Sequence, residues 1–83
     1  MRDGKLTLAT TAKTIYELDG GQYRCQSVGL IPSSDAAGDI SYGFNANCII
    51  PLTSSITIPV KDLRNLWIKS TVANDIAFMV IED

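Results

Sequence analysis

The sequence predicts a small all-β domain, an antiparallel β-sandwich or small barrel of seven or eight strands. Short runs alternate apolar and polar residues with a period of two, which is typical of strands because successive side chains leave a strand on opposite sides. Turn-forming residues such as Asp19-Gly20-Gly21 and Asn74-Asp75 separate these runs. The short connections between the runs are typical of antiparallel sandwiches and barrels.

The 83 residues form a single domain, 1–83. A chain of this size buries only about 60–65% of the surface that its unfolded form exposes, so its hydrophobic core is modest. Ordering the chain costs roughly 1.5 kcal/mol per residue, which nearly cancels the gain from apolar burial. Because small domains often need a disulfide, a metal or oligomerisation for stability, we expect a partner.

The charge distribution argues against nucleic acid and membranes as partners. The net charge is −2 and the seven Lys and Arg residues are scattered along the sequence, whereas nucleic-acid-binding proteins carry a concentrated basic surface. No apolar run approaches the ~20 residues needed to cross a bilayer. The segment from Met1 to Gly4, which contains Arg2 and Asp3, is too polar for a secretory signal. We therefore expect a soluble protein made in a cytoplasm.

The sequence offers little for catalysis or metal binding. It contains no histidine, which removes the commonest general base and the commonest metal ligand. No pair of carboxylates is placed to converge across a cleft. Asp35 and Asp39 lack the spacing and the closing glutamate of a calcium-binding loop. We therefore predict that the protein is not an enzyme and has no metal or cofactor site.

The two cysteines, Cys25 and Cys48, lie inside strand-like runs. Two cysteines in a chain without a secretory signal do not indicate a disulfide scaffold. We favour two buried thiols that act as small hydrophobic residues, and a disulfide bridge between them is the alternative.

The N-terminal third predicts three strands. Residues 5–10 form an edge strand with Leu6 and Leu8 facing inward. Residues 12–18 suit a helix or a strand, and we favour the strand because Thr14, Ile15 and Tyr16 are β-formers. The Asp-Gly step that follows supplies the positive φ angles of a tight hairpin turn, so we expect 14–18 to pair with 22–29.

The middle of the chain predicts a loop over 31–39, because Pro32 and several Ser, Asp and Gly residues favour turns. Residues 40–44 form the next strand, with Ile40, Tyr42 and Phe44 on one face. A break at 45–47 precedes a short apolar strand over 48–52.

The strand that follows places Ile56, Ile58 and Val60 on one face. Pro59 cannot donate a hydrogen bond to a neighbouring strand, so this strand ends there or lies at a sheet edge. A polar crossover at 61–65 leads to the next strand, which has Leu66 and Ile68 on one face and Trp67 on the other.

The last strand, 75–81, is apolar on both faces, whereas a strand with one wet face alternates. One face carries Ile76, Phe78 and Val80, and the opposite face carries Ala77, Met79 and Ile81. The second face is covered either by the protein itself or by a second subunit. We favour a subunit contact because large uncovered apolar patches mark interfaces; the predicted contact residues are Trp67, Ala77, Met79 and Ile81.

The C-terminal third resembles small virion proteins of tailed bacteriophages. The shared pattern is a Ser-apolar-Thr strand, an Asp-Leu-x-Asn-Leu-aromatic-Ile segment, a turn of small residues and a last apolar strand. The matching residues are Ser55 to Val60, Asp62, Leu63, Asn65 to Ile68, and Ser70 to Asp75.

This resemblance implies a jelly-roll-like β-sandwich that assembles as a homo-oligomer, commonly a homotrimer, on the outside of a capsid. It implies that the protein decorates the shell or cements neighbouring capsomers, with the major capsid protein or another virion protein as partner. The implied location is the virion, after synthesis in the cytoplasm of the bacterial host. The alternative function is a tail or spike module that recognises a host-surface glycan through an exposed aromatic platform, with candidates Tyr16, Tyr23, Tyr42 and Trp67.

Overall fold

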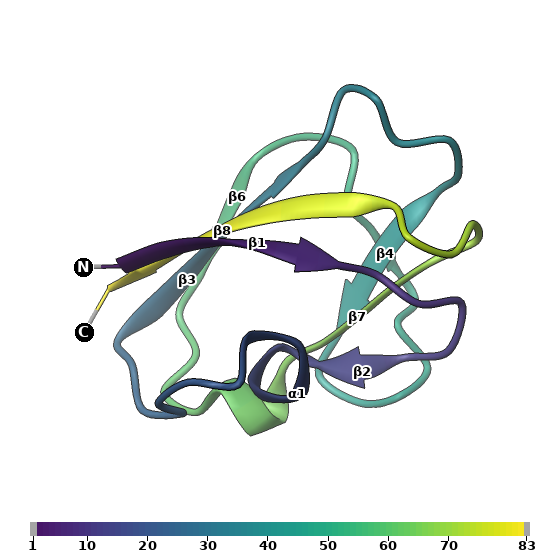
Figure 1. The fold of residues 1–83 in the computed structure, drawn as a ribbon. Helices are drawn as coiled ribbons and strands as arrows, with labels where there is room; N and C mark the ends of the chain where they lie inside the picture. The colour runs from purple at the N-terminus through teal and green to yellow at the C-terminus, as the bar shows by residue number, and fades with distance from the viewer. Residues whose placement is uncertain (1, 83) are drawn as a thin grey trace.

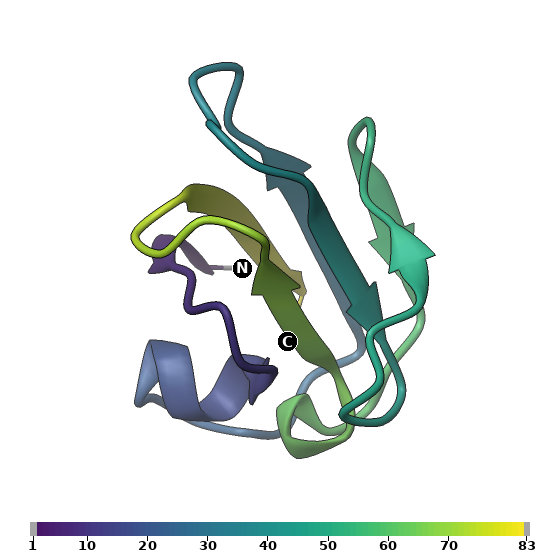
Figure 2. The ribbon, with the colours of Figure 1, turned by 90° about the vertical axis from the view of Figure 1, so that its right-hand side faces the viewer.

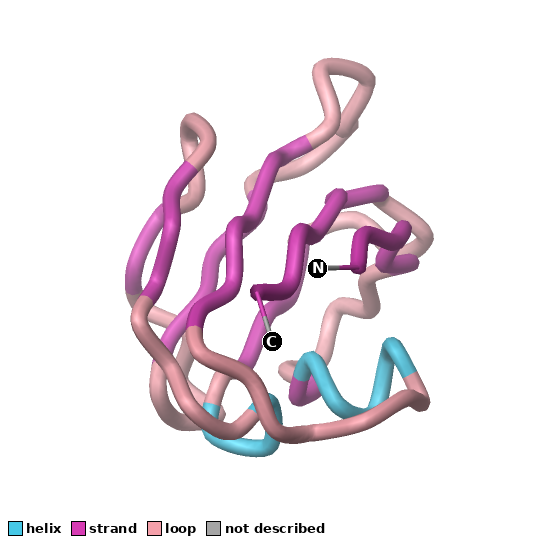
Figure 3. The backbone as a smooth tube through the Cα atoms, turned by 90° about the vertical axis from the view of Figure 1, so that its left-hand side faces the viewer, coloured by secondary structure: helices cyan, strands magenta, loops and turns pink. Residues whose placement is uncertain are grey.

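The computed structural model describes residues 2–82, which form two four-stranded antiparallel sheets packed face to face (Figures 1 and 3). The strands of the first sheet, in spatial order, are β1 (Arg2–Thr7), β8 (Ile76–Glu82), β3 (Ser27–Pro32) and β6 (Ile56–Ile58). Those of the second are β2 (Lys13–Thr14), β7 (Trp67–Ser70), β4 (Ile40–Gly43) and β5 (Ile50–Pro51). A short helix, α1 (Ile15–Asp19), follows β2, and a 3-10 turn, η1 (Leu63–Asn65), precedes β7.

The strand pairing is nested along the chain. β4 pairs with β5, β3 with β6, β2 with β7 and β1 with β8. The chain therefore corresponds to one long hairpin with its tip between β4 and β5, rolled up so that successive pairs fall in alternate sheets. This is the arrangement of a jelly roll. The predicted antiparallel sandwich, its eight-stranded form and its jelly-roll topology are confirmed within residues 2–82.

The hydrophobic core fills the space between the two sheets. Leu6 and Leu8 are buried as the sequence predicted, and so are the Leu66 and Ile68 side chains. Other fully buried core side chains come from both sheets and their connections, and they include Ile15, Val28, Leu30, Leu63, Ala77, Met79 and Ile81. The predicted edge positions are also confirmed, since β1 and β6 are the two outer strands of the first sheet, although β1 spans Arg2–Thr7 and not 5–10.

Residues 15–19 form a helix, so the predicted strand over 12–18 is wrong beyond Thr14. Thr14 is the N-cap: its hydroxyl accepts a hydrogen bond from the Glu17 backbone amide, and the Glu17 carboxylate accepts from the Thr14 amide. This reciprocal capping box satisfies backbone amides at the start of the helix. The helix start is therefore stabilised despite the β propensity of the residues that follow. Ile15 is then buried at the start of the helix.

The predicted hairpin between 14–18 and 22–29 is also wrong. Gly20 does adopt a positive φ, 72°, but it is the left-handed C-cap of α1, and its amide donates to the Tyr16 carbonyl. Residues 22–26 form no strand, apart from a single β-bridge between Arg24 and Asp62. β3 begins at Ser27 and lies between β8 and β6.

β8 faces the core with the opposite side from the one predicted. Ala77, Met79 and Ile81 were expected to contact a second subunit, but their side chains are 0, 1 and 0% exposed inside the sandwich. Register explains the error: Leu6, which points into the core, is directly opposite Ala77 on β8. When both faces of a strand are apolar, its own sequence does not choose between them, and the neighbouring strand does.

The loop regions depart from the prediction at three further points. Ile31 and Pro32 belong to β3, so the loop predicted over 31–39 begins at Ser33. Phe44 is 58% exposed, so it does not share the buried face of Ile40 and Tyr42. The predicted strand 48–52 is reduced to Ile50–Pro51, because Cys48 turns the chain with a φ of 48°. Figure 2 shows loops 33–39 and 52–55 at one end of the sandwich, with α1 and η1 at the other. Within the described residues, no helix is long and apolar enough to cross a membrane.

Candidate functional site

The side of the first sheet that faces away from the core carries an apolar surface. We call it the outer apolar face and define it by Ile31, Ile76, Phe78 and Val80. Phe78 is 43% and Ile31 37% exposed, while Ile76 and Val80 are half-buried. Phe78 and Ile31 are directly opposite each other on β8 and β3. The face therefore lies mainly on the central strands of the sheet.

Gly29 lies next to Val80 on this face. The two residues are paired across β3 and β8, and a Cβ on Gly29 would lie 3.7 Å from the Val80 Cβ. Because glycine has no side chain, nothing at this position covers Val80. A shallow hollow of about 330 Å³ opens beside it and is lined by Asp3, Gly4, Ile31, Phe78, Met79 and Val80.

Charged residues border the outer apolar face on β1. Lys5 is paired with Phe78 and Asp3 with Val80, and Glu82 continues the outward row of β8. An apolar centre with a polar rim is the usual composition of a protein–protein interface. A phenylalanine side chain buries about 200 Å², so the exposed 43% of Phe78 is worth about 2 kcal/mol when it leaves water.

Trp67 lies on the outward side of the second sheet, as predicted. It pairs with Thr14 on one side and with Gly43 on the other, and its side chain is half-buried. Its outward position therefore does not bring it next to the outer apolar face, which belongs to the other sheet. Its role in a subunit contact stays a prediction.

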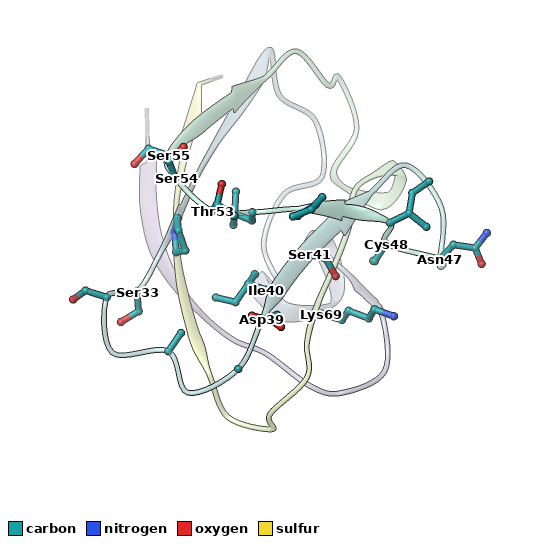
Figure 4. Close-up of a pocket in the computed structure, with 17 residues that line it drawn as sticks. Ser33, Asp39, Ile40, Ser41, Asn47, Cys48, Thr53, Ser54, Ser55 and Lys69 are labelled. Atoms are coloured by element: carbon teal, nitrogen blue, oxygen red, sulfur yellow. The ribbon is translucent and has the colours of Figure 1, made fainter.

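A groove of about 1060 Å³ opens between loops 33–39 and 52–55, and we call it the loop groove (Figure 4). Figure 4 shows Ser33 on one wall and Ser54 and Ser55 on the other, with Ile40 farther along the groove next to Asp39. Asp39 and Lys69 also line the groove. Hydroxyl groups are frequent along its rim, and no aromatic side chain lines it within the described residues.

One wall of the loop groove is held in place by the Asp75 carboxylate. It accepts hydrogen bonds from the amides of Ala37, at 3.0 Å, and Gly38, at 2.9 Å. The Ser70 hydroxyl donates to the same carboxylate at 2.6 Å. The Ser70 hydroxyl and these amides keep the pKa of Asp75 below its usual range. The loop predicted from its turn-forming residues is thus anchored to the β7–β8 turn.

The aromatic candidates for a glycan platform are largely occupied. Tyr42 is buried. Tyr16 and Tyr23 pack edge to face, with ring centroids 6.0 Å apart and an interplanar angle of 85°. The Arg64 guanidinium lies 3.8 Å from the centroid of the Tyr23 ring. One face of Tyr23 is therefore covered by the protein itself.

The cysteines are buried as separate thiols, which confirms the favoured interpretation. The Cys25 thiol donates to the Val60 carbonyl at 3.0 Å. Burial raises the pKa of the Cys48 thiol, and the nearby Lys69 charge opposes that rise. Within residues 2–82, no cluster of three or more His, Cys, Asp or Glu side chains is placed to hold a metal ion.

Comparison with known proteins assigns no relative to this chain. No protein-family model matches it. No curated protein and no solved structure matches it either.

Proposed function

We propose that this protein is a structural virion protein of a tailed bacteriophage, which assembles as a homotrimer and decorates or cements the capsid between capsomers. The observation that carries the proposal is the outer apolar face. Monomeric proteins rarely expose large contiguous apolar patches, and such patches mark interaction sites. The proposed contact is therefore Ile31, Ile76, Phe78 and Val80, and not the buried side of β8.

The jelly-roll fold adds support by analogy. This topology recurs among viral capsid proteins, although lectins and other classes also use it. The residues that resemble phage virion proteins occupy β6, η1, β7 and the turn into β8. The partner proposed from that resemblance is the major capsid protein or another virion protein.

The proposed mechanism is stabilisation by mass action. A protein that binds only the assembled shell lowers the free energy of that shell by RT ln(1 + [L]/Kd) per site. Burial of the exposed part of Phe78 supplies about 2 kcal/mol toward the contact between subunits, which forms the trimer that binds the shell. No chemical step is required of the protein in this role.

The test compares two single variants, Phe78→Glu and Val72→Glu, in co-sedimentation with assembled capsids. Val72 is 39% exposed in the β7–β8 turn, so it is a matched apolar position outside the outer apolar face. Glu at position 78 lies opposite Lys5, a favourable cross-strand pair that preserves the sheet. We expect wild type and Val72→Glu to pellet with capsids and Phe78→Glu to stay in solution. Equal pelleting of both variants would rule out the outer apolar face as the contact.

A second candidate function, recognition of a host-surface glycan by a tail or spike module, is favoured by the loop groove. Sugar hydroxyls form hydrogen bonds with carboxylates, amides and hydroxyls, and Asp39, Asn47 and the serine rim supply these groups. If this candidate is correct, wild type binds a defined class of glycan on an array and Asp39→Ala loses the signal. An array without any reproducible signal would eliminate it.

A further inference from the structure

The fold brings two segments together at the end of the sandwich that carries α1 and η1. Residues 22–26 and 61–64 are joined by hydrogen bonds from the Cys25 amide to the Lys61 carbonyl, at 3.1 Å, and from the Leu63 amide to the Tyr23 carbonyl, at 2.8 Å. A hollow of about 520 Å³ lies between them. We call it the basic cleft; its lining residues are Gln22, Tyr23, Arg24, Cys25, Gln26, Lys61, Asp62 and Arg64.

The basic cleft has a positive charge although the chain is acidic. Three of the seven Lys and Arg residues line it, namely Arg24, Lys61 and Arg64, against the single carboxylate of Asp62. Three positive charges and one negative charge leave +2 at this place, while the whole chain has −2. The three cationic side chains are exposed, so they are accessible to a ligand.

The Arg64 guanidinium is held in one orientation before any ligand arrives. It stacks 3.8 Å from the centroid of the Tyr23 ring. Asp62 accepts from its Nε at 3.1 Å and from its Nη2 at 2.8 Å. These contacts use one edge of the guanidinium and leave Nη1 outside the Asp62 pair. A pre-oriented donor loses little conformational entropy on binding, which raises affinity.

Two more cationic groups flank this fixed donor. The Arg24 guanidinium lies 6.0 Å from the centroid of the same Tyr23 ring. The Lys61 ammonium donates to the Gln26 side-chain oxygen at 2.5 Å, and an ammonium has three donors. The cleft therefore presents two guanidiniums and one ammonium around a common hollow.

The small number of cations in the basic cleft favours a short acidic peptide over a nucleic acid as its ligand. Nucleic acids are bound through many phosphate contacts spread along a basic surface. Here only three cations are clustered, and Asp62 lies among them. A few carboxylates on a short peptide match three cations, and guanidiniums bind carboxylates with good geometry.

We propose that the basic cleft is a docking site for a short acidic segment of a partner protein, with two or three Asp or Glu carboxylates bound by Arg24, Lys61 and Arg64. This site lies at the α1 and η1 end of the sandwich, and its residues are distinct from those of the outer apolar face. The proposal holds whether or not the partner belongs to a phage capsid.

The experiment uses a fluorescein-labelled octaglutamate peptide as the probe and fluorescence anisotropy as the readout. We expect saturable binding that weakens when NaCl is raised from about 50 to about 200 mM, because salt screens exposed charges. The double variant Arg24→Gln/Lys61→Gln should weaken binding by at least about tenfold. Arg64 is left unchanged because it also packs on Tyr23.

The matched control is Lys5→Gln/Lys13→Gln, which removes the same charge from β1 and β2. It should bind the peptide within about twofold of wild type after the small loss of long-range attraction. Equal weakening in both double variants would mean that the peptide senses only net charge, and it would overturn the proposal. Absence of saturable binding to wild type would do the same.

Two further measurements test where the peptide binds on the folded wild-type protein and whether a nucleic acid binds more tightly than the peptide. Amide chemical shifts of wild type titrated with octaglutamate should change at Gln22, Gln26 and Asp62, and shifts confined to another surface would overturn the proposal. An eight-nucleotide oligothymidylate should bind more weakly than the peptide. Tighter binding of the oligonucleotide would replace the acidic peptide by nucleic acid and refute the assignment.

Discussion

Glutamate at position 79 should unfold the domain, whereas glutamate at the adjacent position 78 should leave it folded. Met79 is 1% exposed in the core, so Met79→Glu loses about 2 kcal/mol of apolar burial. To enter the core, the new carboxyl must be neutral at pH 7, and a rise of its pKa by about three units costs roughly 4 kcal/mol. The sum, about 6 kcal/mol, compares with a total stability of roughly 4–12 kcal/mol for a domain of this length.

Phe78→Glu has a much smaller expected cost. The Phe78 side chain is already 43% exposed on the outer apolar face, so at most about 3 kcal/mol of burial is lost, and the new carboxylate stays in water without a rise of its pKa. Lys5 is directly opposite, and a cross-strand pair of opposite charges returns a few tenths of a kcal/mol. The two variants therefore introduce the same group at neighbouring positions with opposite outcomes.

Urea unfolding followed by Trp67 fluorescence and circular dichroism measures both variants. Each is measured at a high and a low protein concentration, because loss of an oligomer lowers apparent stability only when assembly contributes. We expect no cooperative transition for Met79→Glu and a near-normal slope for Phe78→Glu. A Phe78→Glu protein that is less stable than Met79→Glu at both concentrations would show that the faces of β8 are reversed.

Two further predictions concern the loop that forms one wall of the groove. The folded-state pKa of Asp75 is lowered by the Ser70 hydroxyl and two backbone amides; its stabilisation is therefore complete above the unfolded-state pKa of about 3.9 and is lost as pH falls toward the folded-state value. Asp75→Asn should lower stability at pH 7 and flatten the acid limb of a melting-temperature profile, and an unchanged limb would contradict this. Gly38→Ala places a Cβ 2.8 Å from Val72 Cγ2 and 2.9 Å from the Val72 amide nitrogen, so we expect a loss of about 1–3 kcal/mol. Gly29→Ala meets no atom closer than 3.6 Å and should cost less than about 1 kcal/mol; equal losses in urea unfolding would disprove the crowding at Gly38.

The alternating patterns predicted the sheets well because they report a physical difference between core and solvent. Leu6 and Leu8 alternate with polar residues, and both are buried. Pro59 directly follows β6, an edge strand, as its missing amide donor requires. The strand predicted over 12–18 rested on the β propensity of residues such as Ile15 and Tyr16. It gave no weight to a helix signal in the same segment. Thr14 and Glu17 have the spacing of a capping box, and this spacing indicates a helix start.

The functional surfaces were harder to predict, because they depend on pairing between distant segments. The outward side of β8 is set by its register with β1, and both of its faces are apolar in sequence. The basic cleft brings Arg24 next to residues 61–64, although the two segments are far apart in the chain. In the sequence these cations therefore look scattered. Trp67 was correctly expected to point outward, because it alternates with Leu66 and Ile68.

The mass of the wild-type protein in solution tests the central claim most directly. Light scattering coupled to size-exclusion chromatography measures it without any capsid or variant. We predict a homotrimer, three times the 9.0 kDa of one chain, with Phe78 protected inside the contact. A species of 9.0 kDa at every concentration, with the outer apolar face fully accessible to solvent, would contradict the account.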